Sequence, residues 1–428
     1  MVVIKSFINL FIILLCLITE EVHSSQIIDY EAEEFIYELI DEIKIANNID
    51  ENFNIKIVQD ENINAFVDQN NIIYITSALI ENCDDYIALL SVIAHEIGHI
   101  DNNHIDKRIL KKNNLNNINT FTNLSLIASS LLFNNPEVIK GIFLSGSRLS
   151  EYNLNFSKDQ EREADYYSLE TLKKLNLYSN SIINLLLAIE KKSLEKGFTK
   201  DKLKYSTHPY FEERIDIIKY LNNNKGKNLD EDLNLKFKFM QAKFIGYSGN
   251  IININKLKDP FKMYANAILN AKKGNLKDSL RNLNKLILTN KKNFFLVETK
   301  ADILFSYGYT NESIKFYNKV INEYPNNNYA QIRIFENTNV KNLTNKEIEI
   351  QFIKNLNLLN KYYNNKNLLQ KYLELSEYTG KTDWKEFIYY WLNKNEDHER
   401  IKKKLNEYKE SNDKHLSDLA QLIYNNYQ

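Results

Sequence analysis

The sequence is poor in the residues that make turns and disulfides. Its 428 residues include only 10 glycines and 4 prolines, a composition that argues against turn-rich sheets and favours helices. It has two cysteines, Cys16 and Cys83. If the N-terminal segment that carries Cys16 is removed, no intramolecular disulfide can form. A packed hydrophobic core must then supply most of the stability.

The sequence also lacks an excess of positive or negative charge. Lys and Arg number 55 against 56 for Asp and Glu, and the formal net charge is -1. This balance gives no overall cationic footprint for nucleic acid, so we expect no nucleic-acid partner. The chain is 43% hydrophobic and long enough for two domains, each with its own core.

Histidine is scarce, yet two of the seven histidines stand four residues apart in His95-Glu96-Ile97-Gly98-His99. About 0.015 such matches are expected by chance from these counts. The run 86–100 is apolar around most of a helix, which predicts a buried helix. Both imidazoles would share one face of it and could hold one zinc ion, with Glu96 beside them to accept a proton from water.

The N-terminus carries a short apolar run, residues 7–18, between Lys5 and a polar stretch. This pattern predicts a cleavable signal peptide over residues 1–24. The alternative is an uncleaved membrane anchor, although twelve apolar residues are short for a bilayer. An exported protein of the bacterial periplasm fits the pattern, with another secretory lumen left open.

A small sheet is expected before the histidine helix. Residues 27–47 have a helical period, residues 53–58 alternate as a strand, and residues 64–67 and 72–75 read as a hairpin that turns at 68–71. We expect the strand at 72–76 to hold an extended substrate by adding it as another strand. The alternative is that this strand serves the sheet alone.

Two features follow the histidine pair. His104 lies one residue beyond the next helical position after His99, so we expect it to face away from the metal and to be structural. The apolar segments 124–133 and 138–149 are each too short to span a membrane. A lid over the site, a peripheral membrane contact and plain core all remain open for them.

The best source of a third ligand is a helix that begins after Ser157, with Gln160 completing a capping box. Glu161 and Asp165 are four residues apart and share a face. Glu161 could bind the metal, while Asp165 accepts a hydrogen bond from a ligand histidine. Glu163 is expected to point elsewhere. The alternative is an ordinary acidic helix start.

Three blocks follow one another along the chain: His95–His99, Glu161-x-x-Ala164-Asp165, and Ser206-Thr207-His208-Pro209 with Glu213-Arg214-Ile215. In this order they resemble the HtpX-like and CAAX-prenyl-protease-like family of zinc metallopeptidases. The resemblance covers roughly residues 50–220 and is closest to the BepA-type periplasmic proteases, which carry C-terminal tetratricopeptide repeats. Asn64-Ala65-Phe66 is also similar, whereas Asn70-Asn71 departs from the glycine of many members.

The resemblance implies an α+β, gluzincin-type metallopeptidase domain over residues 25–225. It implies one Zn2+ per chain, bound by His95, His99 and Glu161, with Glu96 as general base. It also implies that His208 and Arg214 lie beside the substrate carbonyl, where they would stabilise an oxyanion. In a latent state, His208 could instead be a fourth ligand of the metal.

Residues 226–428 show an internal period. Ala267, Gly274 and Ser279 recur as Ala301, Gly308 and Ser313, at a constant offset of 34 residues. This is the length of a tetratricopeptide repeat, so we expect an all-α repeat domain of that kind. From residue 345 onward the helical pattern persists while the register fades, which favours degenerate repeats or capping helices.

These observations predict a zinc-dependent endopeptidase. Its substrates would be proteins or peptides, in particular misfolded or stalled envelope (outer-membrane) proteins, and an envelope protein would bind the repeat domain. Two alternatives remain open. One is a chaperone-like or scaffold protein that acts through its repeats while the protease site is inactive. The other is a domain in which zinc is purely structural.

Overall fold

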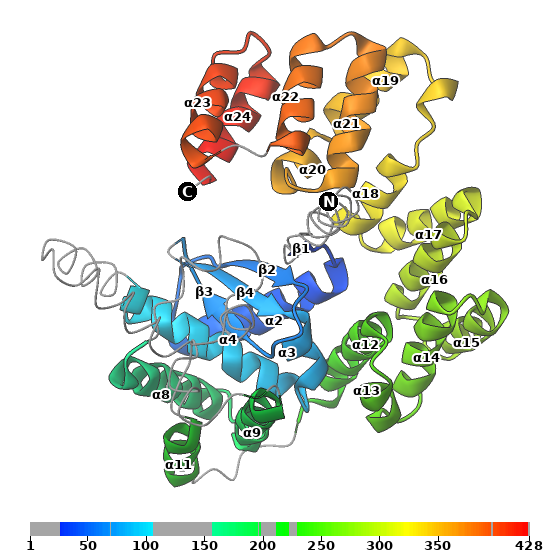
Figure 1. Cartoon of the computed structure of the whole chain (residues 1–428). Helices are drawn as coiled ribbons and strands as arrows, with labels where there is room; N and C mark the ends of the chain where they lie inside the picture. Colours follow the sequence, from blue (N-terminus) through cyan, green and yellow to red (C-terminus); the bar gives the residue numbers. More distant parts are fainter. Residues whose placement is uncertain are drawn as a thin grey trace, which may run out of the picture. The chain divides into compact units, whose positions relative to one another are not determined.

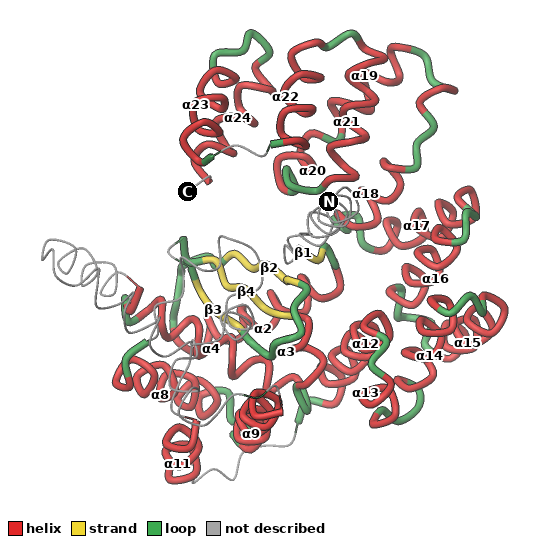
Figure 2. Tube along the Cα trace, viewed as in Figure 1, coloured by secondary structure: helices red, strands yellow, loops and turns green. Residues whose placement is uncertain are grey.

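A computed structural model describes residues 26–68, 70–105, 156–195, 197, 211–221, 229–394 and 397–426. Its contacts divide the chain into two compact units, one through Leu269 and one from Asn270 (Figure 1). The first unit combines strands and helices, and the second is helical (Figure 2). Four features predicted from the sequence lie outside the described residues: the signal peptide 1–24, the segments 124–133 and 138–149, and His208.

The predicted small sheet is present in the first unit. Its strands are β1 (Gln26–Ile27), β2 (Asn54–Val58), β3 (Ala65–Val67) and β4 (Ile72–Thr76), in the order β1-β2-β4-β3. β3 and β4 form the predicted hairpin, with Val67 opposite Ile73. Asn71 adopts the left-handed conformation in its turn (φ 57°), which asparagine tolerates better than most residues.

The prediction that the strand at 72–76 receives substrate is wrong. β4 pairs in parallel with β2 on one side and antiparallel with β3 on the other. Both edges of β4 are therefore occupied, and it cannot accept a further strand.

Helices α2 (Tyr30–Asn47) and α4 (Tyr86–Asp101) follow the order expected from the sequence, and a short helix that was not predicted, α3 (Ser77–Asn82), lies between them. α4 is buried on nearly every side, as its apolar sequence predicts, and most of its residues belong to the core of this unit. Asp85 caps α4 by accepting a hydrogen bond from the Ala88 amide, and its other oxygen accepts from the hydroxyls of Tyr178 and Ser181.

The next helices are α8 (Lys158–Lys174), α9 (Asn180–Glu195) and α11 (Phe211–Leu221). The predicted capping box of Ser157 and Gln160 starts α8. α4 and α8 pack closely at Gly98, where an added Cβ would lie 3.0 Å from the Cβ of Tyr167. The Ser168 hydroxyl also donates to the Ser91 carbonyl, 2.8 Å away. Two independent contacts thus join the helices that carry the predicted ligands.

The first compact unit extends beyond residue 225, the domain boundary that the sequence predicts. α12 (Glu231–Ser248) and α13 (Ile251–Lys256) belong to the first unit. The Gln241 amide donates to the carbonyls of Ile80 and Cys83, and the Lys243 ammonium lies 2.7 Å from a carboxylate oxygen of Glu31. These buried polar contacts attach α12 to the α+β part of the chain.

After α13, a pair of helices occurs twice in succession. α14 (Phe261–Lys272) and α16 (Phe295–Ser306) begin 34 residues apart, as do α15 (Leu276–Thr289) and α17 (Thr310–Glu323). Gly274 and Gly308 occupy equivalent turns, and both have positive φ angles. The predicted offset of 34 is therefore present in the helices. α18 (Asn328–Glu336) follows.

The remainder of the second unit is helical without that regular offset. A short 3-10 turn, η2 (Val340–Asn342), precedes six helices: α19 (Asn345–Lys354), α20 (Leu356–Lys361), α21 (Lys366–Thr379), α22 (Thr382–Asn393), α23 (His398–Lys409) and α24 (Lys414–Asn426). Trp384 and Trp391 are buried in this part. Among the described residues, no helix is long and apolar enough to cross a membrane.

Candidate metal centre

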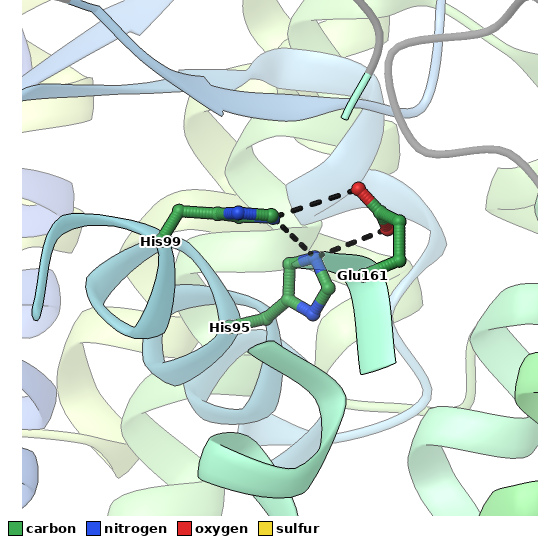
Figure 3. Close-up of side chains that lie close together, drawn as sticks. All are labelled: His95, His99 and Glu161. Atoms are coloured by element: carbon green, nitrogen blue, oxygen red, sulfur yellow. Dashed lines mark hydrogen bonds and ion pairs between the residues drawn. The ribbon is translucent and has the colours of Figure 1, made fainter. Parts of the chain in front are cut away.

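Two histidines of α4 and a glutamate of α8 converge at one point (Figure 3). The Nε2 atoms of His95 and His99 are 3.1 Å apart. Glu161 places Oε2 3.6 Å from His95 Nε2 and Oε1 3.6 Å from His99 Nε2. All three residues are buried, with 5%, 0% and 1% of their surface exposed. Glu161, which follows His99 by 62 residues in the chain, thus meets two histidines that are four residues apart on α4.

The donor set fits zinc in both spacing and type. Ligands at about 2.0–2.1 Å in a tetrahedral arrangement lie about 3.3 Å from one another. The three measured separations, 3.1, 3.6 and 3.6 Å, bracket that value. Two imidazoles and one carboxylate are also the three protein ligands of many catalytic zinc sites, which leave a fourth position open.

The charge around the site also fits a divalent cation. Glu96, Glu161 and Asp165 are buried acids, and the one buried guanidinium that the structure describes beside them is Arg214. Burial and the charge of Arg214 lower the pKa of His95, but hydrogen bonds to Asp165 and Glu161 outweigh them and raise it to about 9. The surroundings therefore favour a positive charge at this imidazole, which a proton or a metal ion can supply.

The far side of His95 is held by a buried ion pair. Its Nδ1 lies 3.0 Å from Asp165 Oδ1. Arg214 donates to both oxygens of Asp165, at 2.7 and 2.8 Å, and its third nitrogen lies 3.3 Å from Glu161 Oε2. Burial would raise the pKa of Asp165, but the Arg214 charge and the hydrogen bonds from His95 and Arg214 lower it. Asp165 thus stays ionised and orients His95.

The far side of His99 is held differently. Its Nδ1 is hydrogen-bonded to Nδ1 of His104, 2.9 Å away, and His104 Nε2 is hydrogen-bonded to Glu163 Oε2 at 2.8 Å. The ring of Phe156 stacks on His99 with centroids 3.6 Å apart. The expectation that His104 faces away from the site was wrong, because α4 ends at Asp101 and does not continue to residue 104.

Residues 29–222 match peptidase family M48. The chain carries an M48 peptidase domain. Members of that family are zinc metallopeptidases, so the domain is that of a hydrolase, and its buried His95, His99 and Glu161 are consistent with zinc.

Two curated relatives match the M48 domain at low identity. The putative beta-barrel assembly-enhancing protease of Vibrio cholerae is 24% identical over 173 residues, and the beta-barrel assembly-enhancing protease of Yersinia pestis is 25% identical over 172 residues. Each match covers 40% of this chain and 34% of the relative. The chain thus spans about a third of the length of the curated relatives it matches.

Within the M48 domain, the structure brings together most of the residues singled out from the sequence. Asp165 contacts His95, and Glu96 is buried on α4 with 1% of its surface exposed. Arg214 lies against Asp165 and Glu161, so contact between it and a substrate carbonyl stays a prediction. The roles of Glu96 as base and of His208 as oxyanion donor or fourth ligand also stay predictions.

The pair of His104 and Glu163 was missed as part of the site. A signal for it exists in Asn102-Asn103, which ends α4: Asn102 caps the helix by donating to the Gly98 carbonyl, and Asn103 has φ 53°. A left-handed residue directly after a helix redirects the chain, and here it brings His104 back over His99. Helical periodicity alone cannot detect such a turn.

Proposed function

We propose that this chain is a zinc-dependent endopeptidase that uses Glu96 as general base. The observation that carries the proposal is the convergence of His95 Nε2, His99 Nε2 and the Glu161 carboxylate in a buried site. Glu96 follows His95 on the same helix and is itself buried. A ligand pair with an adjacent acid is the arrangement that metal-assisted hydrolysis needs.

In the proposed reaction, each residue of the site has a separate role. Zinc, when bound, supplies a Lewis acid that makes water nucleophilic near neutral pH. Glu96 would act as the general base that takes a proton from the attacking water and returns it to the leaving amine. Asp165 holds His95 in the orientation that presents Nε2, and Arg214 holds Asp165 and Glu161 through its forked nitrogens. We retain His208 as a further donor to the oxyanion, or as a fourth ligand that keeps the enzyme latent.

We further propose an exported enzyme, in a bacterial periplasm, that acts on misfolded or stalled outer-membrane proteins. Two observations support this proposal. The first is the apolar run 7–18 near the N-terminus, which is typical of a signal peptide. The second is the similarity to two proteins whose names describe beta-barrel assembly-enhancing proteases.

The helical region would serve as a tetratricopeptide-like surface for an envelope protein partner. The offset of 34 residues between the pairs α14–α15 and α16–α17 supports this assignment. The same feature supports the alternative of a scaffold whose protease site is inactive, so the test must separate binding from cleavage.

The test combines zinc analysis with casein cleavage for the wild type, Glu96→Gln and His208→Ala. We expect one zinc per chain in all three, no cleavage in Glu96→Gln, and faster cleavage in His208→Ala if the histidine keeps the enzyme latent. Glu170→Gln, a change in an acid that pairs with Lys173 on α8, is the matched control and should behave as the wild type.

Three outcomes would redirect the proposal. Cleavage that survives in Glu96→Gln would remove this residue as the base. Zinc binding without cleavage in every variant would favour the scaffold. A chain that binds no zinc would contradict the proposal at its foundation.

A further inference from the structure

The two ligand histidines are supported by unlike partners. His95 contacts a carboxylate directly, whereas His99 contacts a second histidine, which in turn contacts a carboxylate. His104 is completely buried, so its ring nitrogens cannot exchange these partners for bulk water. The side chain of Glu163 is 55% exposed. His99, His104 and Glu163 thus form a row of hydrogen-bonded residues that runs from the buried site to the exposed surface of α8.

The hydrogen bonds in this row permit only one arrangement of protons when His99 binds a metal. A histidine that binds through Nε2 is neutral and carries its proton on Nδ1. His99 Nδ1 must then donate to His104 Nδ1, which accepts. A neutral His104 therefore carries its own proton on Nε2, where it donates to Glu163 Oε2. Each nitrogen along the row has a defined role.

We propose that His104 and Glu163 are positioning residues that hold His99 in its metal-binding tautomer and orientation. This inference rests on the proposed zinc site and adds two residues to its support. His104 supplies the buried acceptor that the Nδ1 proton of His99 needs, and Glu163 ensures that His104 accepts at that atom. Phe156 restricts the ring plane of His99 by stacking on it.

The expected cost of breaking the row follows from burial. A hydrophobic residue at 104 would leave the Nδ1–H of His99 facing an apolar group in a fully buried position, which destabilises the metal-binding tautomer. Residues that support ligand histidines typically contribute about 10- to 100-fold in metal affinity. The exposed end of the row matters less, because water can replace the Glu163 carboxylate in part.

The test measures zinc affinity of the full chain by competition with a chromophoric chelator, and the visible spectrum of the Co2+-substituted protein. We expect His104→Leu to weaken zinc binding by about 10- to 100-fold, and Glu163→Gln by up to about 10-fold. His104→Gln should recover most of the affinity, because its amide offers an acceptor and a donor. The Co2+ spectrum should change in His104→Leu and return towards the wild type in His104→Gln.

Glu170→Gln is the matched control for Glu163→Gln. Both acids lie on α8 and line the same open cavity of about 660 Å³, but Glu170 pairs with Lys173, whereas Glu163 pairs with His104. The control should bind zinc as the wild type does. Because Glu163 is half-exposed, its variant also tests the row if His104→Leu fails to fold.

Two results would overturn this inference while leaving the zinc site intact. In one, Glu163→Gln and the folded His104 variants all bind zinc within twofold of the wild type, with an unchanged Co2+ spectrum. In the other, His104→Gln is as weak as His104→Leu, which would assign the effect to packing. A wild-type chain without zinc affinity would overturn the proposed function and this inference together.

Discussion

Each unit of this protein contains a cluster of polar side chains within its helices, and the two clusters are built on opposite principles. In the helical unit, Asp302 Oδ1 accepts hydrogen bonds from Tyr317 and Tyr329, at 2.5 and 2.7 Å, and Arg333 Nε donates to the Tyr329 hydroxyl. Burial raises the pKa of both tyrosines, so their hydroxyls remain donors. Donors and acceptors face one another in this cluster.

In the M48 domain, three groups that can each bind a metal ion face one another. The Nε2 atoms of His95 and His99 and the oxygens of Glu161 point at a common centre, where a single proton cannot satisfy all of them. The cluster in the helical unit is complete with its own hydrogens. In the M48 domain, Arg214 lies 3.3 Å from Glu161 Oε2, and the ligand atoms of His95, His99 and Glu161 are spaced so that they could share one cation.

The largest effect should come from removing a ligand. Glu161→Gln should reduce zinc affinity by more than the roughly 100-fold that marks the upper range for supporting residues, and casein cleavage should fall with it. Thermal unfolding of the helical unit should not change. Metal analysis after dialysis and the cleavage assay give the two readouts. Full zinc content in this variant would show that the metal lies elsewhere.

Breaking the support of His95 should have the next largest effect. Asp165→Asn leaves the buried Arg214 without its bidentate partner and should lower the free energy of unfolding by about 3 kcal/mol. Zinc affinity should fall about 10- to 100-fold. Urea unfolding measured with chelator present separates the two contributions. An unchanged stability would mean that Glu161 alone satisfies Arg214.

The helical cluster should respond in stability alone. Tyr317→Phe removes one donor to Asp302 and should lower the free energy of unfolding of that unit by about 2 kcal/mol, with zinc affinity unchanged. Tyr309→Phe, at a tyrosine that is 49% exposed, is the control. If Tyr317→Phe altered zinc binding, the two clusters would be coupled and the contrast between them would fail.

The smallest effect concerns the contact between α4 and α8. Gly98→Ala places a methyl group 3.0 Å from the Tyr167 side chain and should cost about 1 kcal/mol, with a measurable loss of zinc affinity because α8 carries Glu161. Gly246→Ala on α12 is the matched control, because its added methyl group would lie equally close, 3.0 Å, to Ala265 and Ile268 of α14. It should lose stability and keep its affinity for zinc.

The parts of this fold that could be predicted from the sequence are local. His95 and His99 share a face because they are one helical turn apart, and the same holds for Glu161 and Asp165 on α8. The hairpin of β3 and β4 was also predictable, because adjacent strands joined by a short turn pair with each other.

The parts that could not be predicted depend on distant contacts or on an irregular turn. The parallel pairing of β2 with β4 places β4 inside the sheet, and no property of the strand at 72–76 itself reveals its neighbours. His104 reaches His99 only because the chain turns at Asn103, and its partner Glu163 lies 59 residues further along. Periodicity extended past the end of a helix gives the wrong face.

The close contact of α4 with α8 at Gly98 also bears on how long a bound metal would stay. The ligands belong to two helices, and opening of their interface separates Glu161 from the histidines. Metal release and partial unfolding would then share one step, so the residence time of zinc would report the free energy of that local opening. Hydrogen exchange of the α8 amides should therefore slow when zinc is bound. The slowing should correspond to the free energy by which bound zinc stabilises the closed interface.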